Sequence, residues 1–159
     1  MEMSFSPTGE THTSRLRPAG DSVEQRAAEA RLIQGLAEEL RVILVKKNLH
    51  LPDGGKLELD GSCDNPPIAC EAWAHIGPAK VAQKQKLMTD AFKLIFASQF
   101  LPKGTRKILV LADADAAKHL RGRSWMAQAL KANRVELKII DLPQEAIDSL
   151  RAAQKRQYR

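Results

Sequence analysis

The sequence predicts an α/β fold with a mixed β-sheet. Segments with a helical period alternate with short β-rich runs in the order α-β-β-α-β-α-β-α. Two of the β-rich runs follow each other across a polar turn, which is typical of an antiparallel hairpin. A later run, RKILVLAD (106–113), is almost continuously apolar, like strands that are buried in a parallel sheet. A hairpin joined to parallel strands makes the sheet mixed.

A long amphipathic helix is expected first. Ser22, with Gln25 three residues later, has the pattern of a capping box, and a helical period continues over 23–47. The LPDGG stretch (51–55) ends this helix. Its expected apolar stripe consists of Ile33, Leu36, Leu40 and Ile43.

The predicted hairpin and a second helix follow. Its strands are expected at about 56–62 and 67–75, because these runs are bounded by turn residues. The pair Gly77-Pro78 marks a turn into a helix with proline at its first position, and this helix runs to about Gln99. Its expected buried stripe consists of Val81, Met88, Ala91, Phe92 and Ile95.

The remaining elements extend the sheet towards the C-terminus. After the 106–113 strand we expect a helix at about 115–131, a strand at 135–141 and a last helix from Pro143. Asp113 and Asp115 follow the buried strand directly. One of them is expected to cap the next helix, although an Asp-x-Asp pair at a strand end is also able to hold magnesium.

Length and composition indicate one domain. The chain has 159 residues, enough for one hydrophobic core, and we expect the domain to cover 22–159. Residues 1–21, rich in Ser, Thr, Gly and Pro, are expected to be a disordered leader. No apolar run is long enough to cross a bilayer, so we expect a cytoplasmic protein without a membrane partner. Cys63 and Cys70 are expected to be reduced thiols.

The net charge favours an anionic partner. The chain carries a formal charge of +6 and has a pI near 9.5. Basic residues gather late in the chain, at 118–123 and 151–159, where they would attract phosphate backbones or serve only for solubility. Arg121 and Arg123 are candidate nucleic-acid contacts.

Two carboxylates are the central candidates for a functional site. Asp60 ends the run KLELD, and Glu71 lies in PIACEAWAH on the next predicted strand. If the strands pair, both acids lie beside the lysine-rich start of the next helix, which carries Lys80, Lys84 and Lys86. Carboxylate oxygens bind hard cations such as Mg²⁺ or Mn²⁺, while lysines stabilise a phosphate. The pattern predicts metal-dependent phosphodiester chemistry.

This arrangement resembles the PD-(D/E)XK superfamily, the restriction-endonuclease-like nucleases. The resemblance covers about residues 22–112, with Asp60 and Glu71 at the positions of the family's acids. It implies a three-layer α-β-α core, to which 113–159 adds an α-β-α extension, a DNA substrate and a possible homodimer. The chain also resembles small uncharacterised bacterial proteins that share an E-x-W-A-H…G…K…Q…K segment, here EAWAHIGPAKVAQKQK (71–86).

The chain departs from the family pattern at Trp73, where the resemblance calls for a lysine. Helix geometry suggests that the amine comes from Lys84, with Lys80 as the second candidate. The second resemblance emphasises Lys80, Gln83 and Lys86, and we expect the latter two to contact nucleic acid. His75 is a further candidate for phosphate or metal, although a structural hydrogen bond is the simpler interpretation.

Three functions follow from these residues. The first is a metal-dependent deoxyribonuclease in which Asp60 and Glu71 bind the ion and Lys84 or Lys80 supports the transition state. The second is a catalytically inactive relative that binds nucleic acid or a protein, favoured by Trp73. The third is a structural module that touches no nucleic acid. Trp73 itself, like Trp125, is expected to pack in the core.

Overall fold

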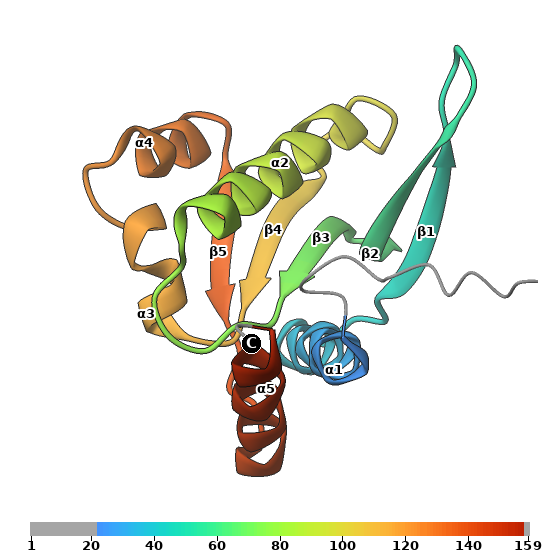
Figure 1. The fold of residues 1–159 in the computed structure, drawn as a ribbon. Helices are drawn as coiled ribbons and strands as arrows, with labels where there is room; N and C mark the ends of the chain where they lie inside the picture. The colour runs from blue at the N-terminus through green and yellow to red at the C-terminus, as the bar shows by residue number, and fades with distance from the viewer. Residues whose placement is uncertain (1–21, 158–159) are drawn as a thin grey trace, which may run out of the picture.

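The computed structural model describes residues 22–157, so the expected leader at 1–21 lies outside the described part of the chain. The described residues form five strands, five α-helices and one short 3₁₀ helix (Figure 1). In chain order these are α1 (Val23–Leu40), β1 (Val45–His50), β2 (Lys56–Asp64), β3 (Pro67–Trp73), α2 (Val81–Ser98), β4 (Arg106–Leu111), α3 (Ala114–Ala117), the 3₁₀ helix Lys118–Leu120, α4 (Trp125–Ala132), β5 (Val135–Ile139) and α5 (Gln144–Arg156).

The sheet is mixed, as predicted. Its strand order is β1-β2-β3-β4-β5. β1, β2 and β3 pair antiparallel, whereas β3, β4 and β5 pair parallel. The β-rich runs that begin at Lys56, Pro67, Arg106 and Val135 are therefore confirmed as strands. β5 pairs with β4 and forms the edge of the sheet opposite to β1.

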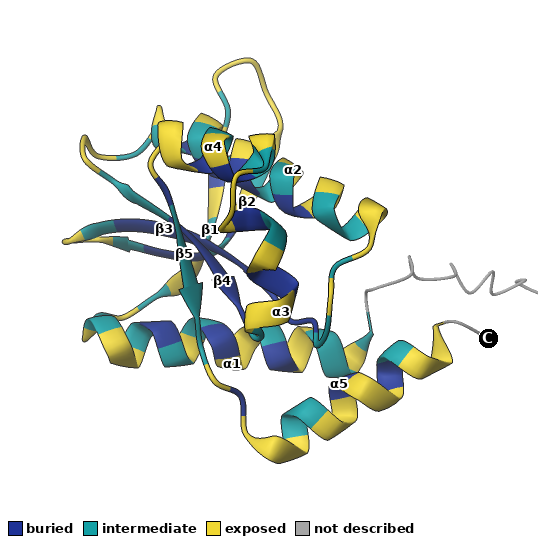
Figure 2. Cartoon of the chain, turned by 90° about the vertical axis from the view of Figure 1, so that its left-hand side faces the viewer, coloured by how far each residue is buried: buried dark blue, intermediate teal, exposed yellow. Residues whose placement is uncertain are grey.

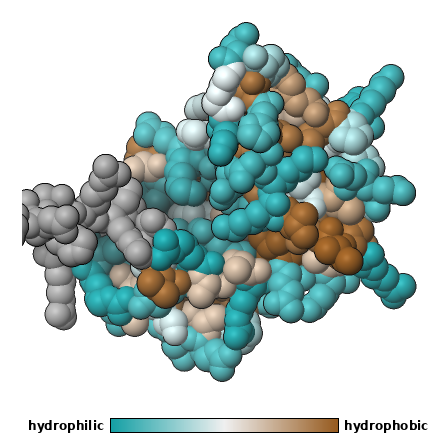
Figure 3. Space-filling view, turned by 90° about the vertical axis from the view of Figure 1, so that its right-hand side faces the viewer, coloured by the Kyte–Doolittle hydropathy of each residue, from teal (hydrophilic) through white to brown (hydrophobic). Residues whose placement is uncertain are grey.

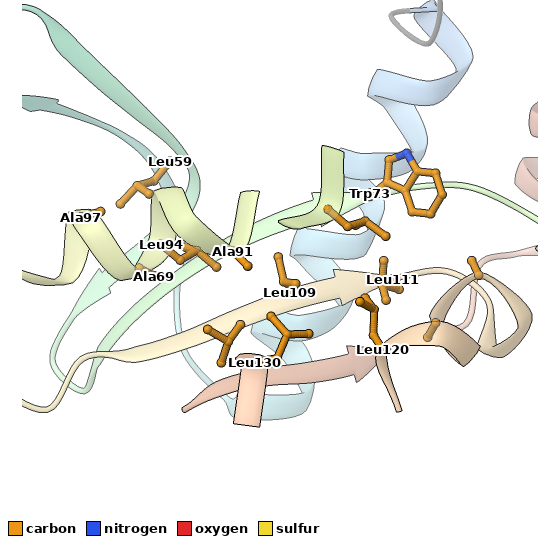
Figure 4. Packing of buried hydrophobic residues seen from close by; sticks show 14 of the residues in the cluster. Leu59, Ala69, Trp73, Ala91, Leu94, Ala97, Leu109, Leu111, Leu120 and Leu130 are labelled. Carbon is orange, nitrogen blue, oxygen red and sulfur yellow. The ribbon is translucent and has the colours of Figure 1, made fainter. Parts of the chain in front are cut away.

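Helices cover both faces of the sheet and make three layers (Figures 1 and 2). α2 and α4 pack on one face, where Leu94 and Leu130 meet Leu109 and Trp73 in one buried cluster (Figure 4). α1 and α5 pack on the other face. Successive residues of β4 alternate between the two clusters, as strand geometry requires. The central strands are therefore buried on both sides.

The first helix is shorter than predicted, and a strand takes the place of its last turn. α1 ends at Leu40, because Arg41 adopts the left-handed conformation with φ of 54°. Residues 42–47 continue the apolar pattern of the helix but are rich in Val, Ile and Leu, which suit a strand, and β1 begins at Val45. Ile43, expected on the buried stripe, is 81% exposed. The sheet therefore has a fifth strand that the sequence analysis missed.

The expected helix at 115–131 is interrupted. Helical structure stops at Leu120, and α4 begins after Ser124, whose hydroxyl accepts a hydrogen bond from the Ala127 N–H at 3.1 Å. The Arg-Gly-Arg sequence between the two pieces contains the glycine that lowers helix propensity. Trp125, expected in the core, is the first residue of α4 and is 67% exposed.

The surface seen from the β1 side is mostly hydrophilic, with separate hydrophobic patches (Figure 3). Among the described residues, none of the helices is both long enough and apolar enough to span a bilayer. Cys63 and Cys70 are free thiols, and Cys70 is buried. Between Ser22 and Gln157, the large hydrophobic residues that remain exposed are Val23, Ile43, Val45, Val81, Phe92, Phe96, Phe100 and Trp125.

Candidate active site

β2 and β3 form a fork, and Asp60 and Glu71 lie where the two strands part. Residues 61–64 of β2 pair with residues 67–70 of β3. Beyond these pairs β2 continues only beside β1, and β3 continues beside β4. In Figure 1 the β1–β2 hairpin leans away from β3 at this point. Asp60 and Glu71 are the next cross-strand positions, so the hairpin brings the two acids together.

A β-bulge in the β1–β2 hairpin helps to position Asp60. The register between β1 and β2 shifts between Val45 and Lys47, so that β2 carries one extra residue. Such a bulge bends a strand and changes the direction of its side chains. The close approach of β2 to β3 also requires Gly61, because a Cβ atom there would lie 2.7 Å from Cys70 Sγ. The geometry of the fork is therefore encoded next to Asp60.

Where β3 and the residues after it face the fork, their backbone N–H groups donate hydrogen bonds to side chains instead of to a neighbouring strand. Because β2 leaves this edge, its alternate N–H groups need other acceptors. Two of the acceptors are carboxylates, and their hydrogen bonds hold Asp60 and Glu29 at the fork. The bonds run from Ala72 N to Asp60 Oδ2 (2.9 Å), from Ala74 N to Glu29 Oε1 (3.5 Å) and from Ile76 N to Gln154 Oε1 (3.1 Å).

Glu71 is a buried acid that pairs with a lysine from α2. Its side chain is 5% exposed, and its Oε1 atom lies 2.7 Å from Lys93 Nζ. Burial raises the pKa of Glu71 to about 8, the charge of Asp60 adds to this shift, and Lys93 opposes it. Oε1 makes no hydrogen bond of acceptable angle within the described residues, so the ion pair is not supported by directed bonds.

A second group of charges crosses the fork. Lys86 Nζ lies 3.1 Å from Asp90 Oδ2, one helical turn further along α2. Burial raises the pKa of Glu29 on α1, whereas the nearby charge of Lys86 lowers it. Lys86 on α2 is therefore near enough to Glu29 on α1 for its charge to act across the gap between β2 and β3. The fork gathers the three acids Glu29, Asp60 and Glu71 with two lysines.

Solvent reaches the fork from the α1 side. A cavity of about 230 Å³ lies between α1 and the base of the hairpin. Glu29 and Asp60 line it, together with the cationic residues Arg26 and Lys46. Its remaining walls are apolar side chains, Ile33 among them. A charged ligand that enters this cavity meets the carboxylates between flanking cations.

The lysine at the fork differs from the one expected. The buried residues of α2 are Leu87, Ala91, Leu94 and Ala97, so Val81 and Phe92, expected to be buried, are 72% and 71% exposed. The helix is rotated relative to the expected stripe, and this rotation directs Lys93 towards Glu71. Lys84 is partly buried but lies near His119, whose pKa is lowered mainly by burial and then by this lysine. The helical spacing of Leu87, Ala91, Leu94 and Ala97 is the sequence signal that would have given the correct buried face of α2 and, with it, Lys93.

The remaining residues of the β3–α2 segment have structural contacts. His75 is buried and stacks on Trp73, with ring centroids 4.7 Å apart and planes within 4°. Burial lowers the pKa of His75, a hydrogen bond with the Pro78 backbone opposes this, and nearby Lys80 lowers it further. Trp73 is 3% exposed, which confirms core packing. The Lys80 N–H donates to Gln83 Oε1 at 2.8 Å, so Gln83 caps α2, which starts three residues after Pro78.

The other predicted contacts lie on the surface. Lys86, Arg121 and Arg123 are exposed, the last two between the 3₁₀ helix and α4. Asp113 occupies the N-cap position of α3 but makes no capping hydrogen bond there. Instead its Oδ2 atom accepts a hydrogen bond from the Gly77 N–H at 2.7 Å, which ties the loop after β3 to the end of β4.

Within residues 22–157 no group of three or more His, Cys, Asp or Glu side chains is arranged to hold a metal ion. Comparison with known proteins adds no assignment, since no family model, curated protein or solved structure matches this chain. The resemblance to PD-(D/E)XK nucleases therefore stays a prediction.

Proposed function

We propose that the protein is a divalent-metal-dependent nuclease of restriction-endonuclease-like fold that hydrolyses DNA phosphodiester bonds at the fork. One observation carries the proposal: Lys93 lies 2.7 Å from buried Glu71, and the charge of nearby Asp60 also acts on Glu71. Two acids and an amine are the groups that the resemblance implies. Lys93 supplies from α2 the amine that Trp73 does not supply from β3.

The donor set fits Mg²⁺ with few protein ligands. Asp60 and Glu71 would hold the ion, and Glu71 contributes a buried carboxyl oxygen, Oε1, once its proton is lost. Mg²⁺ often binds through one or two carboxylates and completes its shell with water and substrate phosphate, so a three-residue group is not required. When bound, the ion would activate water and neutralise charge on the phosphate.

The chain's own residues supply the rest of the site. Lys93 stabilises negative charge that develops on the phosphate and lowers the pKa of Glu71, which favours its ionised form. Asp60 is held in place by the Ala72 N–H. Because the pKa of Glu71 is about 8, protons compete with a cation for its carboxylate. We therefore expect cation affinity and cleavage to rise as pH rises towards 8.

Cleavage of supercoiled plasmid and of single-stranded DNA tests the proposal. Wild type and the variants Glu71→Gln, Asp60→Asn and Lys93→Met are compared with Mg²⁺, with Mn²⁺ and with a chelator, after circular dichroism has shown that each is folded. Loss of one electrostatic contact to the transition state should lower the rate by about 10²–10³-fold. Lys155→Met, which changes an exposed lysine of α5, is the matched control and should leave the rate unchanged.

Three outcomes contradict the proposal in part or in whole. Full activity of Glu71→Gln and Asp60→Asn would show that cleavage does not use the fork. Loss of activity in Lys84→Met but not in Lys93→Met would assign the amine to the residue expected from the sequence. Absence of cleavage with any divalent ion, combined with salt-sensitive DNA binding, would support the inactive nucleic-acid-binding alternative instead.

A further inference from the structure

α2 presents a row of exposed aromatic rings on the side away from the sheet. Phe92, Phe96 and Phe100 follow at intervals of four residues, which places them along one side of the helix and its end. They are 71%, 37% and 39% exposed. The rings of Phe96 and Phe100 meet edge to face, with centroids 5.1 Å apart. Phenylalanine is a costly residue to leave in water at three successive turns, so this row needs an explanation.

The aromatic row begins beside the fork. Phe92 is the neighbour of Lys93 in sequence, and Phe96 lies one turn further on, within reach of Lys93 on the helix surface. Lys93 also contacts Glu71. A ligand that stacks on Phe92 and Phe96 therefore lies near Lys93, whose side chain is 29% exposed.

The aromatic row ends at a cationic hollow. A cavity of about 890 Å³ opens where α2 ends and β4 and β5 begin. These ends of the three elements lie in the upper part of Figure 1. Ser98 and Gln99, the residues before Phe100, form part of its lining. Glu136 is the single acid among its lining residues, and it binds Arg106 through two hydrogen bonds of 2.9 and 2.7 Å. The cations that line the hollow are Lys103, Arg106, Lys107, Lys131 and Arg134.

Helix ends explain only part of this charge. Lys103, Lys131 and Arg134 lie at or after the C-terminal ends of α2 and α4, where cations complement the helix dipole. That effect does not account for Lys107 at the start of β4. It also does not account for the exposed aromatic rings along α2.

We infer that the aromatic row and the cationic hollow together bind single-stranded nucleic acid. Bases stack on exposed aromatic rings, and their phosphates lie against lysine and arginine. Duplex DNA hides the faces of its bases, so it would gain nothing from the phenylalanines. An apolar protein partner would fit the rings but would gain nothing from the adjoining positive charge. Because the inference names the substrate of the proposed nuclease, it rests on that function.

Binding without cleavage tests the inference. Fluorescence anisotropy is measured with a labelled single-stranded oligonucleotide and with its duplex, both in chelator, so that binding is observed whether or not the protein is a nuclease. Phe92→Ala should weaken single-strand binding by about 5- to 150-fold, the usual effect of losing one stacked base. Val81→Ala is the matched control, because Val81 is an equally exposed apolar residue of α2 outside the row.

The hollow is tested by salt dependence. Lys103→Gln with Lys131→Gln should reduce the slope of log affinity against log salt by about 1.4, since each phosphate contact to a single strand contributes about 0.7. Arg151→Gln with Lys155→Gln removes the same charge from exposed positions of α5 and should change the slope less. Equal effects of the two pairs would mean diffuse attraction and would overturn the assignment of the hollow.

Two further results would overturn the inference. Duplex that binds as tightly as the single strand, with no effect of Phe92→Ala, would exclude base stacking. A change of oligomeric state in Phe92→Ala, without a change in oligonucleotide affinity, would identify the row as a contact between copies. Tight single-strand binding with no cleavage in Mg²⁺ would instead reject the nuclease and leave the binding surface standing.

Discussion

Replacing Glu71 by glutamine should change how the free energy of unfolding depends on pH. Glu71 is 4% exposed, and burial together with the charge of Asp60 raises its pKa from 4.5 to about 8, against the opposing effect of Lys93. An unfolded chain returns the carboxyl group to its ordinary pKa. The folded and unfolded states therefore bind different numbers of protons between these two values.

The sign of the effect follows from the raised pKa. Between pH 4.5 and about 8 the folded carboxyl keeps a proton that the unfolded one has lost. The stabilisation is fully present below pH 4.5 and is lost as pH rises through about 8. The whole difference corresponds to at most about 5 kcal/mol, since one pKa unit is worth about 1.4 kcal/mol. Glutamine keeps the size of the side chain but removes the titration.

Urea denaturation in chelator measures this difference. Wild type should lose several kcal/mol more stability than Glu71→Gln between about pH 5.5 and about pH 8.5. Glu29, whose pKa is also raised, is present in both proteins, so its contribution cancels in the comparison. Parallel pH profiles for the two proteins, or a Glu71 carboxyl that titrates near 4.5 by carbon NMR, would refute the reasoning.

Three other perturbations have defined outcomes. Gly61→Ala should cost about 1–3 kcal/mol in urea denaturation, because the new Cβ would lie 2.7 Å from Cys70 Sγ, and Cys70→Ala in the same background should recover part of that loss. Burial raises the pKa of Cys70 to about 12, so a thiol reagent should modify Cys63 alone in the folded protein and both cysteines in denaturant; fast reaction of two thiols without denaturant would contradict this. Asp113→Ala should lower stability by about 1.5–3 kcal/mol through loss of its 2.7 Å hydrogen bond with Gly77, and an unchanged melting temperature would show that this bond contributes nothing.

The sheet could be predicted where a strand pattern differs from a helix pattern. The hairpin and the runs that begin at Arg106 and Val135 are bounded by turn residues and contain no competing helical period. The segment at 42–47 lacks such a boundary, because its apolar residues continue the period of α1. The helix ends because Arg41 adopts a left-handed backbone conformation. An arginine in the sequence does not predict this conformation, which is uncommon for residues other than glycine. β1 was therefore missed because the apolar pattern at 42–47 fits both a continued helix and a strand.

In the candidate site the two acids could be predicted from the sequence, whereas the lysine could not. Asp60 and Glu71 are brought together by the register of one hairpin, which short turn lengths restrict. The lysine depends on the rotation of α2, and adjacent positions of a helix differ in direction by about 100°. A stripe that includes Val81 and Phe92 instead of Leu87 and Leu94 therefore changes which amine reaches the fork.

The amine at the fork comes from α2 and not from the strand position of Trp73. Trp73 occupies the strand position two residues after Glu71, and its ring is committed to the core and to the stack with His75. A lysine there would have to reach the fork from within the layer between β3 and α2, where an unpaired charge is costly. Lys93 avoids this cost because its side chain is 29% exposed while its amine contacts Glu71. The amine at the fork is therefore provided by the packing of a helix on the sheet and not by the strand that carries Glu71.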